Sequence, residues 1–113
     1  KRIYLNMIVM LHQKMDVMYV INYMKITKQQ ISRAKSIDFL ELIESLDIPY
    51  KQESGHIKML CVWHEENTPS LAIYEDHCHC FACGQHSDII GFVMQVFKLS
   101  FQDAVIFLNK ANE

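Results

Sequence analysis

The sequence lacks a strong excess of positive charge. Its formal net charge is −2, with 11 Lys and Arg against 13 Asp and Glu. It therefore falls outside the strongly basic class of nucleic-acid binders. Lys98 and Lys110 are the only Lys or Arg residues after Cys61, so the remaining basic residues lie earlier in the chain. We expect any contact with a polyanion to be weak and to involve residues 24–58.

The chain also lacks an apolar run long enough to span a bilayer. Residues 3–11 are mostly apolar, but His12, Gln13, Lys14 and Asp16 interrupt this run, and no small-residue cleavage site follows it. This argues against a signal peptide and favours an amphipathic or buried helix over residues 3–23. We predict an apolar N-terminal helix or extension over residues 1–26, no membrane partner, and Met24 as one candidate start.

Two short pairs, Cys61 with His64 and Cys80 with Cys83, carry the strongest signal in the sequence. Each pair has the spacing at which a tight turn can aim both side chains at one ion. Fifteen residues separate the pairs, close to the separation of two knuckles that share a metal. Three thiolates and one neutral imidazole suit Zn²⁺ and leave no coordination position open for water. The pattern predicts one structural zinc ion and no catalysis by this chain.

Four cysteines in a short chain are also compatible with two disulfides of a secreted protein. The histidine in ligand register and the crowding of Cys78 beside Cys80 and Cys83 favour zinc instead. Zinc in turn indicates a reducing setting, and we expect a cytoplasmic location. Three further histidines near the second pair are alternative ligands, although their spacing is poorer: His77, His79 and His86.

The remaining patterns predict an α+β fold. A capping box from Thr27 to Gln30 begins one helix, and Ser36 heads another that Pro49 ends. Short alternating segments predict strands over residues 50–53, 56–60, 70–74 and 77–80. Ser87 and Ser100 each head a later helix. The expected architecture is a small zinc ribbon, an antiparallel sheet with two metal knuckles, flanked by helices.

Several of these segments resemble one known family. The runs CVWHEENTPSL from residue 61, HCFACG from residue 79 and SDIIGFVM from residue 87 are similar to the zinc-binding domain of bacterial DnaG-type DNA primases. The run SFQDAV from residue 100 and residues 37–48 look like the closing and opening helices of that domain. The resemblance covers about residues 36–110, and we assign the primase-type zinc-binding domain to residues 27–113.

The resemblance implies a domain that binds single-stranded DNA template and supports RNA primer synthesis in DNA replication. By match to the motif, Cys61, His64, Cys80 and Cys83 would be the zinc ligands, and Cys78 would be a spare thiol. The implied partners are a polymerising domain or a replicative helicase, in cis or in trans. The acidic, magnesium-binding polymerising domain of the family is not among these 113 residues, so DNA-directed RNA polymerase activity would need that domain as well.

The sequence departs from the family pattern at several positions: Cys78 stands where an aromatic is usual, and the loop joining the knuckles looks shortened. Val62 and Trp63 replace a usual proline and phenylalanine, and Ser87 replaces a glycine. None of these changes removes a ligand. Template contacts require cationic or stacking side chains on an accessible face. The candidates are Lys51, His56, Lys58, Trp63, Tyr74 and His79. For Trp63 and Phe81 we expect core packing, because large aromatic side chains beside small metal sites are usually buried.

Two other functions compete with template binding. His64-Glu65-Glu66 with Cys80 and Cys83 echoes the signature of zinc deaminases, but no proline precedes Cys80 and Cys61 would fill the fourth position. A stand-alone module that docks a replication partner, with the methionine-rich N-terminal segment as its docking surface, is the stronger alternative. The low net charge favours docking, and the lysines of the first predicted hairpin favour DNA.

Overall fold

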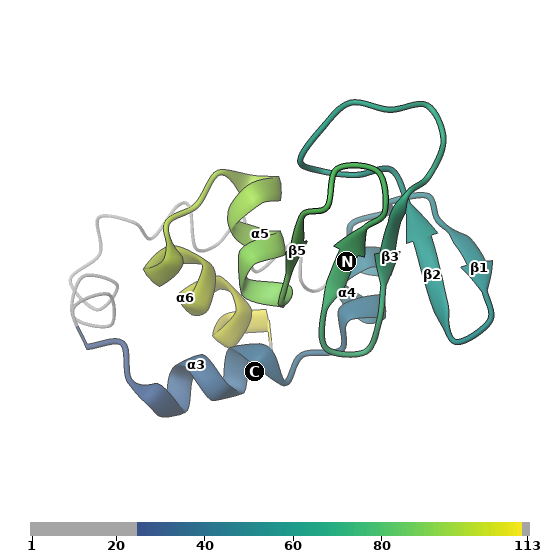
Figure 1. Cartoon of the computed structure of the whole chain (residues 1–113). Helices are drawn as coiled ribbons and strands as arrows, with labels where there is room; N and C mark the ends of the chain where they lie inside the picture. Colours follow the sequence, from purple (N-terminus) through teal and green to yellow (C-terminus); the bar gives the residue numbers. More distant parts are fainter. Residues whose placement is uncertain (1–24, 112–113) are drawn as a thin grey trace.

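The computed structural model describes residues 25–111. They form four helices and five strands, with the sheet on one side and a helical group on the other (Figure 1). The predicted helix over residues 3–23 lies outside the described residues. The predicted α+β zinc-ribbon architecture is confirmed.

The first described helix, α3 (Lys28–Lys35), begins at the predicted capping box. The Thr27 hydroxyl oxygen accepts a hydrogen bond from the Gln30 amide at 3.1 Å, and the Gln30 side-chain oxygen accepts one from the Thr27 amide at 2.8 Å. Two backbone donors that the helix would leave free are thereby satisfied. Ala34 turns its methyl group into the core from this helix.

The second helix, α4 (Phe39–Ser45), begins later than predicted. Asp38 is its N-cap and accepts hydrogen bonds from the Leu40 and Glu41 amides, whereas Ser36 is the C-cap of α3. The helix also ends before Pro49, since Asp47 adopts a positive φ of 57°. Its buried residues are Phe39, Leu42 and Ile43. Leu40 and Leu46 are half-buried and pack against the same core.

The sheet is an antiparallel meander in the order β1-β2-β3-β4-β5. Its strands are β1 (Lys51–Glu53), β2 (His56–Met59), β3 (Leu71–Ile73), β4 (Cys78–Cys80) and β5 (His86–Ser87). The first four match the predicted strands closely, and β5 was not predicted. The turn between β1 and β2 contains Gly55 at a φ of 81°, a conformation that favours glycine.

Two faces of this sheet differ in character. Ile57, Met59, Leu71, Ile73 and Cys78 point to the core side and are at most 3% exposed. The other residues of these strands alternate to the opposite side. Figure 1 shows α4 behind the sheet, leaving the near side of the sheet without a helix over it. The sheet therefore has one buried face and one open face.

The helical hairpin consists of α5 (Ile89–Phe97) and α6 (Phe101–Ala111). Asp88, and not the predicted Ser87, is the N-cap of α5, because its carboxylate accepts the Gly91 amide at 3.0 Å. Ser100 heads α6 as predicted, its hydroxyl accepting the Asp103 amide at 3.1 Å. Helix α6 packs against both α3 and α5.

A single hydrophobic core joins the hairpin to the sheet. Phe39 of α4 and Phe92 of α5 meet edge to face with ring centroids 5.2 Å apart. Phe97 of α5 and Phe107 of α6 meet in the same manner at 5.4 Å. The ribbon and the helices thus share one core, within which these aromatic contacts join α4 to α5 and α5 to α6.

No single helix within residues 25–111 has the length and apolar composition needed to cross a membrane. Helices α5 and α6 pass that test only when taken together, and the chain bends by 108° between them. Their apolar residues instead make up much of the core of the domain.

Candidate metal centre and nucleic-acid face

The two ligand pairs lie at the ends of strands, where the chain turns. Cys61 and His64 follow β2, and Cys80 is the last residue of β4 with Cys83 in the turn after it. Because β2, β3 and β4 are neighbours in an antiparallel sheet, the end of β2 and the end of β4 lie at the same edge. The meander therefore brings both pairs together.

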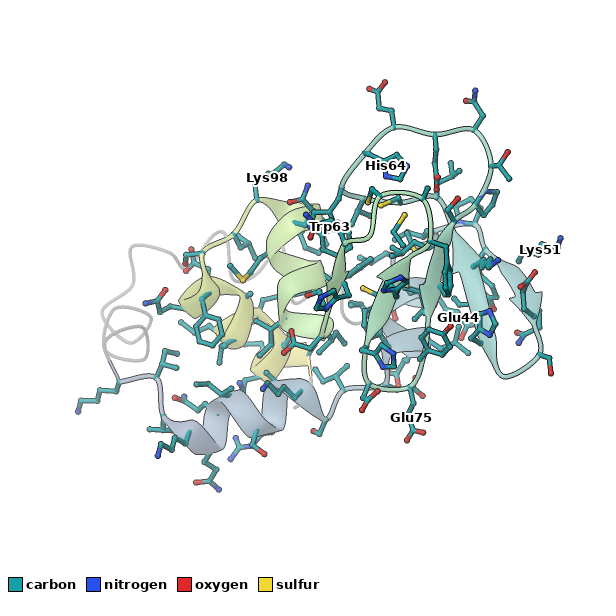
Figure 2. All side chains as sticks on the ribbon, in the orientation of Figure 1. Glu44, Lys51, Trp63, His64, Glu75 and Lys98 are labelled. Atoms are coloured by element: carbon teal, nitrogen blue, oxygen red, sulfur yellow. The ribbon has the colours of Figure 1, made fainter. Side chains whose placement is uncertain are left out.

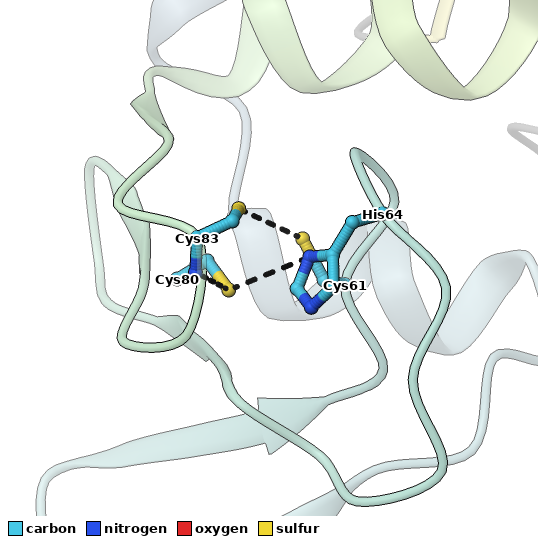
Figure 3. Close-up of side chains that lie close together, drawn as sticks. All are labelled: Cys61, His64, Cys80 and Cys83. Carbon is cyan, nitrogen blue, oxygen red and sulfur yellow. Dashed lines mark hydrogen bonds between the residues drawn. The ribbon is translucent and has the colours of Figure 1, made fainter.

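The four side chains meet in one cluster (Figure 3). The Sγ atoms of Cys61 and Cys83 are 3.9 Å apart, and the Cys80 Sγ is 4.0 Å from Nδ1 of His64. All four ligand atoms lie within 4.8 Å of one another. Thiolates bound tetrahedrally to zinc at about 2.3 Å stand about 3.8 Å apart, whereas a disulfide would need about 2.05 Å. The cluster fits one structural zinc ion.

Backbone amides support the sulfur atoms in each knuckle. The Trp63 amide donates to the Cys61 Sγ at 3.3 Å, and the Cys83 amide donates to the Cys80 Sγ at 3.4 Å. Gly84 adopts a positive φ of 81°, and its amide donates to the Cys80 carbonyl at 2.9 Å. Such donors favour thiolate over thiol.

Cys61 and Cys80, the first ligands of the two knuckles, have pKa values shifted in opposite directions. Burial raises the pKa of the Cys61 thiol to about 11, even though the Trp63 amide lowers it in part. Burial also raises the pKa of Cys80, but the amides of Cys83 and Ala82 outweigh it and the net pKa is lowered. A bound divalent cation favours the thiolate form of both groups, so metal binding releases protons.

Glu66 is a site residue that the sequence reasoning missed. One carboxylate oxygen, Oε1, is 3.1 Å from Nε2 of His64. The other, Oε2, accepts the Cys61 amide at 2.9 Å and the Ser70 amide at 3.1 Å. Burial raises its pKa, but these amide donors outweigh burial and leave the pKa below its usual value. The available signal was a carboxylate two residues after a histidine ligand, which the sequence reasoning considered only for a deaminase.

The remaining cysteine and the nearby histidines stay outside the cluster among the described residues. Cys78 is fully buried on the core side of β4, and burial raises its pKa to about 12. His79 instead stacks beside His86, with ring centroids 6.3 Å apart, and meets Phe81 edge to face at 4.8 Å. His77 stacks on Tyr74 at 4.7 Å.

Five of the six predicted DNA contacts share the open face of the sheet. The strand register places Lys51 opposite Lys58, Lys58 opposite Ala72, Ala72 opposite His79, and His79 opposite His86. Residues directly opposite one another point to the same face. One row across the whole sheet therefore contains three of the predicted contacts, Lys51, Lys58 and His79, together with Ala72 and His86.

An aromatic row runs beside this basic row. The His56 and Tyr74 rings lie 5.0 Å apart, and Tyr74 stacks on His77. We call the two rows together with Phe81 the open face; its residues are Lys51, His56, Lys58, Ala72, Tyr74, His77, His79, Phe81 and His86. It combines lysine and histidine side chains with aromatic rings, of which Phe81 is 62% exposed and Tyr74 is half-buried.

The two aromatic residues expected in the core differ in outcome. Trp63 packs against the core near α5, as expected, and so does not join the open face (Figure 2). Phe81 is 62% exposed, so that expectation was wrong. The Phe81 amide donates to the Ser70 carbonyl, which continues the β3–β4 pairing past Cys80, and the Lys58 Nζ lies 5.6 Å from the Phe81 ring centroid.

Acidic side chains reduce the charge of this face: Asp76 lies 2.7 Å from Nδ1 of His77, and Glu53 contacts two basic groups. An oxygen of Glu53 is 3.5 Å from Nε2 of His56 and 3.7 Å from Nζ of Lys58. Both pairs are partly exposed, so each contributes little to stability. Their effect on a polyanion is larger, because Glu53 places a negative charge beside two of the predicted phosphate contacts.

The fold and the cluster together define a zinc-ribbon domain. A family model described as the CHC2 zinc finger, of the DnaG zinc-ribbon type, matches residues 26–113. The chain belongs to this family, the zinc-binding domain of DnaG-type primases.

Relatives of known name agree with this assignment. A DNA primase of Chlamydia trachomatis is 36% identical over 87 residues, covering 74% of this chain and 14% of that protein. A DNA primase of Neisseria meningitidis serogroup A is 38% identical over 73 residues, covering 63% of this chain and 12% of that protein. The chain thus spans about one seventh of the length of such relatives or less.

A solved structure has the same fold. The crystal structure of the Aquifex aeolicus primase, which contains zinc-binding and RNA polymerase domains, matches with a TM-score of 0.65 and 24% identity. The match covers 75% of this chain and 21% of that chain.

Proposed function

We propose that this chain is a template-binding domain of a DnaG-like primase, with residues 27–113 forming the zinc-binding domain and residues 1–26 an extension. Cys61, His64, Cys80 and Cys83 hold one structural zinc. When bound, the metal supplies a fixed cross-link between the two knuckles. The domain binds single-stranded DNA and supports RNA primer synthesis in DNA replication, which a polymerising domain in cis or in trans carries out.

The observation that carries this proposal is the composition of the open face. Lys51 and Lys58 are spaced along one row to meet backbone phosphates. Tyr74, His79 and Phe81 offer rings on which bases can stack, a mode of binding that tolerates any sequence. These residues lie on one sheet, and the metal cluster lies at the edge of that sheet. Zinc would therefore fix the relative positions of β2 and β4, the strands that lead into the two knuckles.

Salt-dependent binding to a single-stranded oligonucleotide tests the proposal. Fluorescence anisotropy of the zinc-loaded chain should show an affinity that falls with salt, with a slope of about −0.7 per phosphate contact on a log–log plot. Lys58→Ala should weaken binding and reduce that slope by about 0.7. Lys28→Ala, on an exposed position of α3 far from the sheet, is the matched control and should change neither quantity.

A separate variant, Tyr74→Ala, tests the stacking of bases on the open face. Tyr74→Ala should cost about 1–3 kcal/mol of binding free energy while leaving the salt slope unchanged. An affinity that is flat with salt, or absent at low salt, would contradict template binding. It would instead favour the alternative function, docking of a replication partner, which the net charge of −2 and the position of Glu53 beside the basic row support.

A further inference from the structure

Glu66 occupies the centre of the first knuckle. Its carboxylate is mostly buried, with 11% of the side chain exposed, and it has three partners: the ring of His64 and the amides of Cys61 and Ser70. The two amides bracket the knuckle, since Cys61 lies two residues after the end of β2 and Ser70 directly precedes β3. One side chain therefore contacts both ends of the loop and a member of the metal cluster.

The contact with His64 determines which ring nitrogen faces the cluster. A carboxylate can only accept a hydrogen bond, so Nε2 of His64 must carry the proton that points at Oε1 of Glu66. In the neutral imidazole, Nδ1 then keeps its lone pair. Nδ1 is the atom that lies 4.0 Å from the Cys80 sulfur. The proton on one nitrogen thus leaves the other free to bind a metal.

We propose that Glu66 is a positioning residue of the metal centre: it holds His64 in the Nε2-protonated tautomer with Nδ1 directed at the metal, and it sets zinc affinity through this contact in addition to closing the knuckle. This proposal rests on the ligand set given under the proposed function. Carboxylate partners of this kind orient histidine ligands and make them more basic, and their loss typically lowers metal affinity 10- to 100-fold.

Glu66→Gln separates the two contributions of the carboxylate. The amide oxygen of glutamine can still accept from Cys61 and Ser70, which keeps the knuckle closed. Its NH₂ group then faces Nε2 of His64, and two donors cannot share one hydrogen bond. His64 can relieve this conflict only by moving its proton to Nδ1, the atom needed for the metal. The variant should keep the backbone arrangement and weaken zinc binding.

The test is a competition between the protein and a chromophoric zinc chelator. Glu66→Gln should lower zinc affinity 10- to 100-fold, with the amide resonances of Cys61 and Ser70 unchanged at saturating zinc. Glu65→Gln is the matched control, because Glu65 is the exposed neighbour, and it should stay within twofold of the original chain. A Glu66→Gln affinity within twofold would overturn the proposal.

A double-variant cycle distinguishes positioning from a purely structural effect. His64→Cys replaces the imidazole by a thiolate, which has no tautomer to fix. In this background Glu66→Gln should cause no loss of zinc affinity. An equal loss with and without His64 would show that Glu66 acts through the backbone alone, and would refute the proposal.

The tautomer of His64 can also be measured directly on the original chain, without any substitution. Long-range ¹⁵N–¹H correlation spectra of the zinc-loaded domain should show Nε2 of His64 protonated and Nδ1 bound to metal. The opposite assignment would overturn the role of Glu66 while leaving the ligand set intact. If the original chain binds no stoichiometric zinc, or binds it without His64, the ligand assignment of the proposed function fails instead.

Discussion

Cys78 and Cys80 are two residues apart on β4, yet only Cys80 belongs to the metal cluster. We expect Cys61→Ser and Cys83→Ser to lose bound zinc and the folded ribbon, because each removes a ligand. Cys78→Ser should keep one zinc per chain and cost about 1–3 kcal/mol of stability, because it places a hydroxyl in a fully buried position. Elemental analysis combined with thermal unfolding measures both quantities. Equal zinc content in all three variants would contradict the ligand assignment.

Glu53 reduces the positive charge of the open face, since it contacts both His56 and Lys58. Glu53→Gln should increase the affinity for a single-stranded oligonucleotide about two- to fivefold at low salt, and the increase should fade as salt screens the charge. Anisotropy titrations at two salt concentrations measure the change. Glu41→Gln, at an exposed position of α4, is the control for net charge and should have little effect. A decrease in affinity would show that Glu53 orders the lysine rather than opposing the template.

At the scale of elements, the start of α5 depends on a close contact between Ser87 and Gly91. A Cβ atom added at Gly91 would lie 1.9 Å from the Ser87 hydroxyl oxygen and 3.1 Å from its Cβ. Alanine favours a helix more than glycine does, but this clash opposes that gain. Gly91→Ala alone should therefore leave the stability of the domain unchanged or reduce it. In a Ser87→Gly background the same change should stabilise the domain by about 1 kcal/mol.

Chemical denaturation of the four chains in this double-variant cycle measures the coupling. A coupling free energy of about 1 kcal/mol or more is expected for residues in direct contact. Additive effects would mean that Ser87 rotates away without cost.

The sequence predicted the elements better than their ends. The metal pairs and four strands were predictable because ligand spacing and alternation are local signals. The helix starts were harder, since Ser36 and Asp38, like Ser87 and Asp88, are pairs of cap-forming residues close together. The structure uses the aspartate in both cases, and only the path of the chain decides which residue takes the cap. Strand β5 is two residues long, too short for alternation to be visible.

The position of Phe81 was mispredicted for a related reason. Large aromatic residues are usually buried, but Phe81 directly follows Cys80, whose sulfur faces the cluster. Continued alternation then directs Phe81 to the open face, where it is 62% exposed. The spacing of Glu66 from His64 did not reveal its role in the knuckle, because its partners, the amides of Cys61 and Ser70, become neighbours only when the knuckle closes.

At the scale of the whole molecule, the metal and the core depend on each other. A structural zinc of this type contributes on the order of 10 kcal/mol of apparent binding free energy, comparable to the total stability of a domain. Removing zinc with a chelator should therefore unfold the sheet, and with it the shared core. Circular dichroism and the loss of amide dispersion measure this. Restored zinc should restore both signals, and a metal-free chain with unchanged spectra would refute the structural role.

Cobalt substitution reports on the same centre without disturbing the fold. Three sulfur ligands and one nitrogen should give the intense visible spectrum of a closed tetrahedral site, unchanged by small anions such as azide. An anion-sensitive spectrum would indicate an exchangeable position and would revive the deaminase-like alternative.

The alternation along β4 has a consequence for how this domain tolerates change. Cys78 and Cys80 point inward and His79 points outward, all within a three-residue strand. Deleting or inserting one residue in the turn before β4 would shift its pairing with β3 by one position and exchange the two sides. A sulfur ligand would then face solvent and an imidazole would enter the core. We therefore expect the turn over residues 74–77 to tolerate a change of length less well than the loop over residues 65–69, which pairs with no strand.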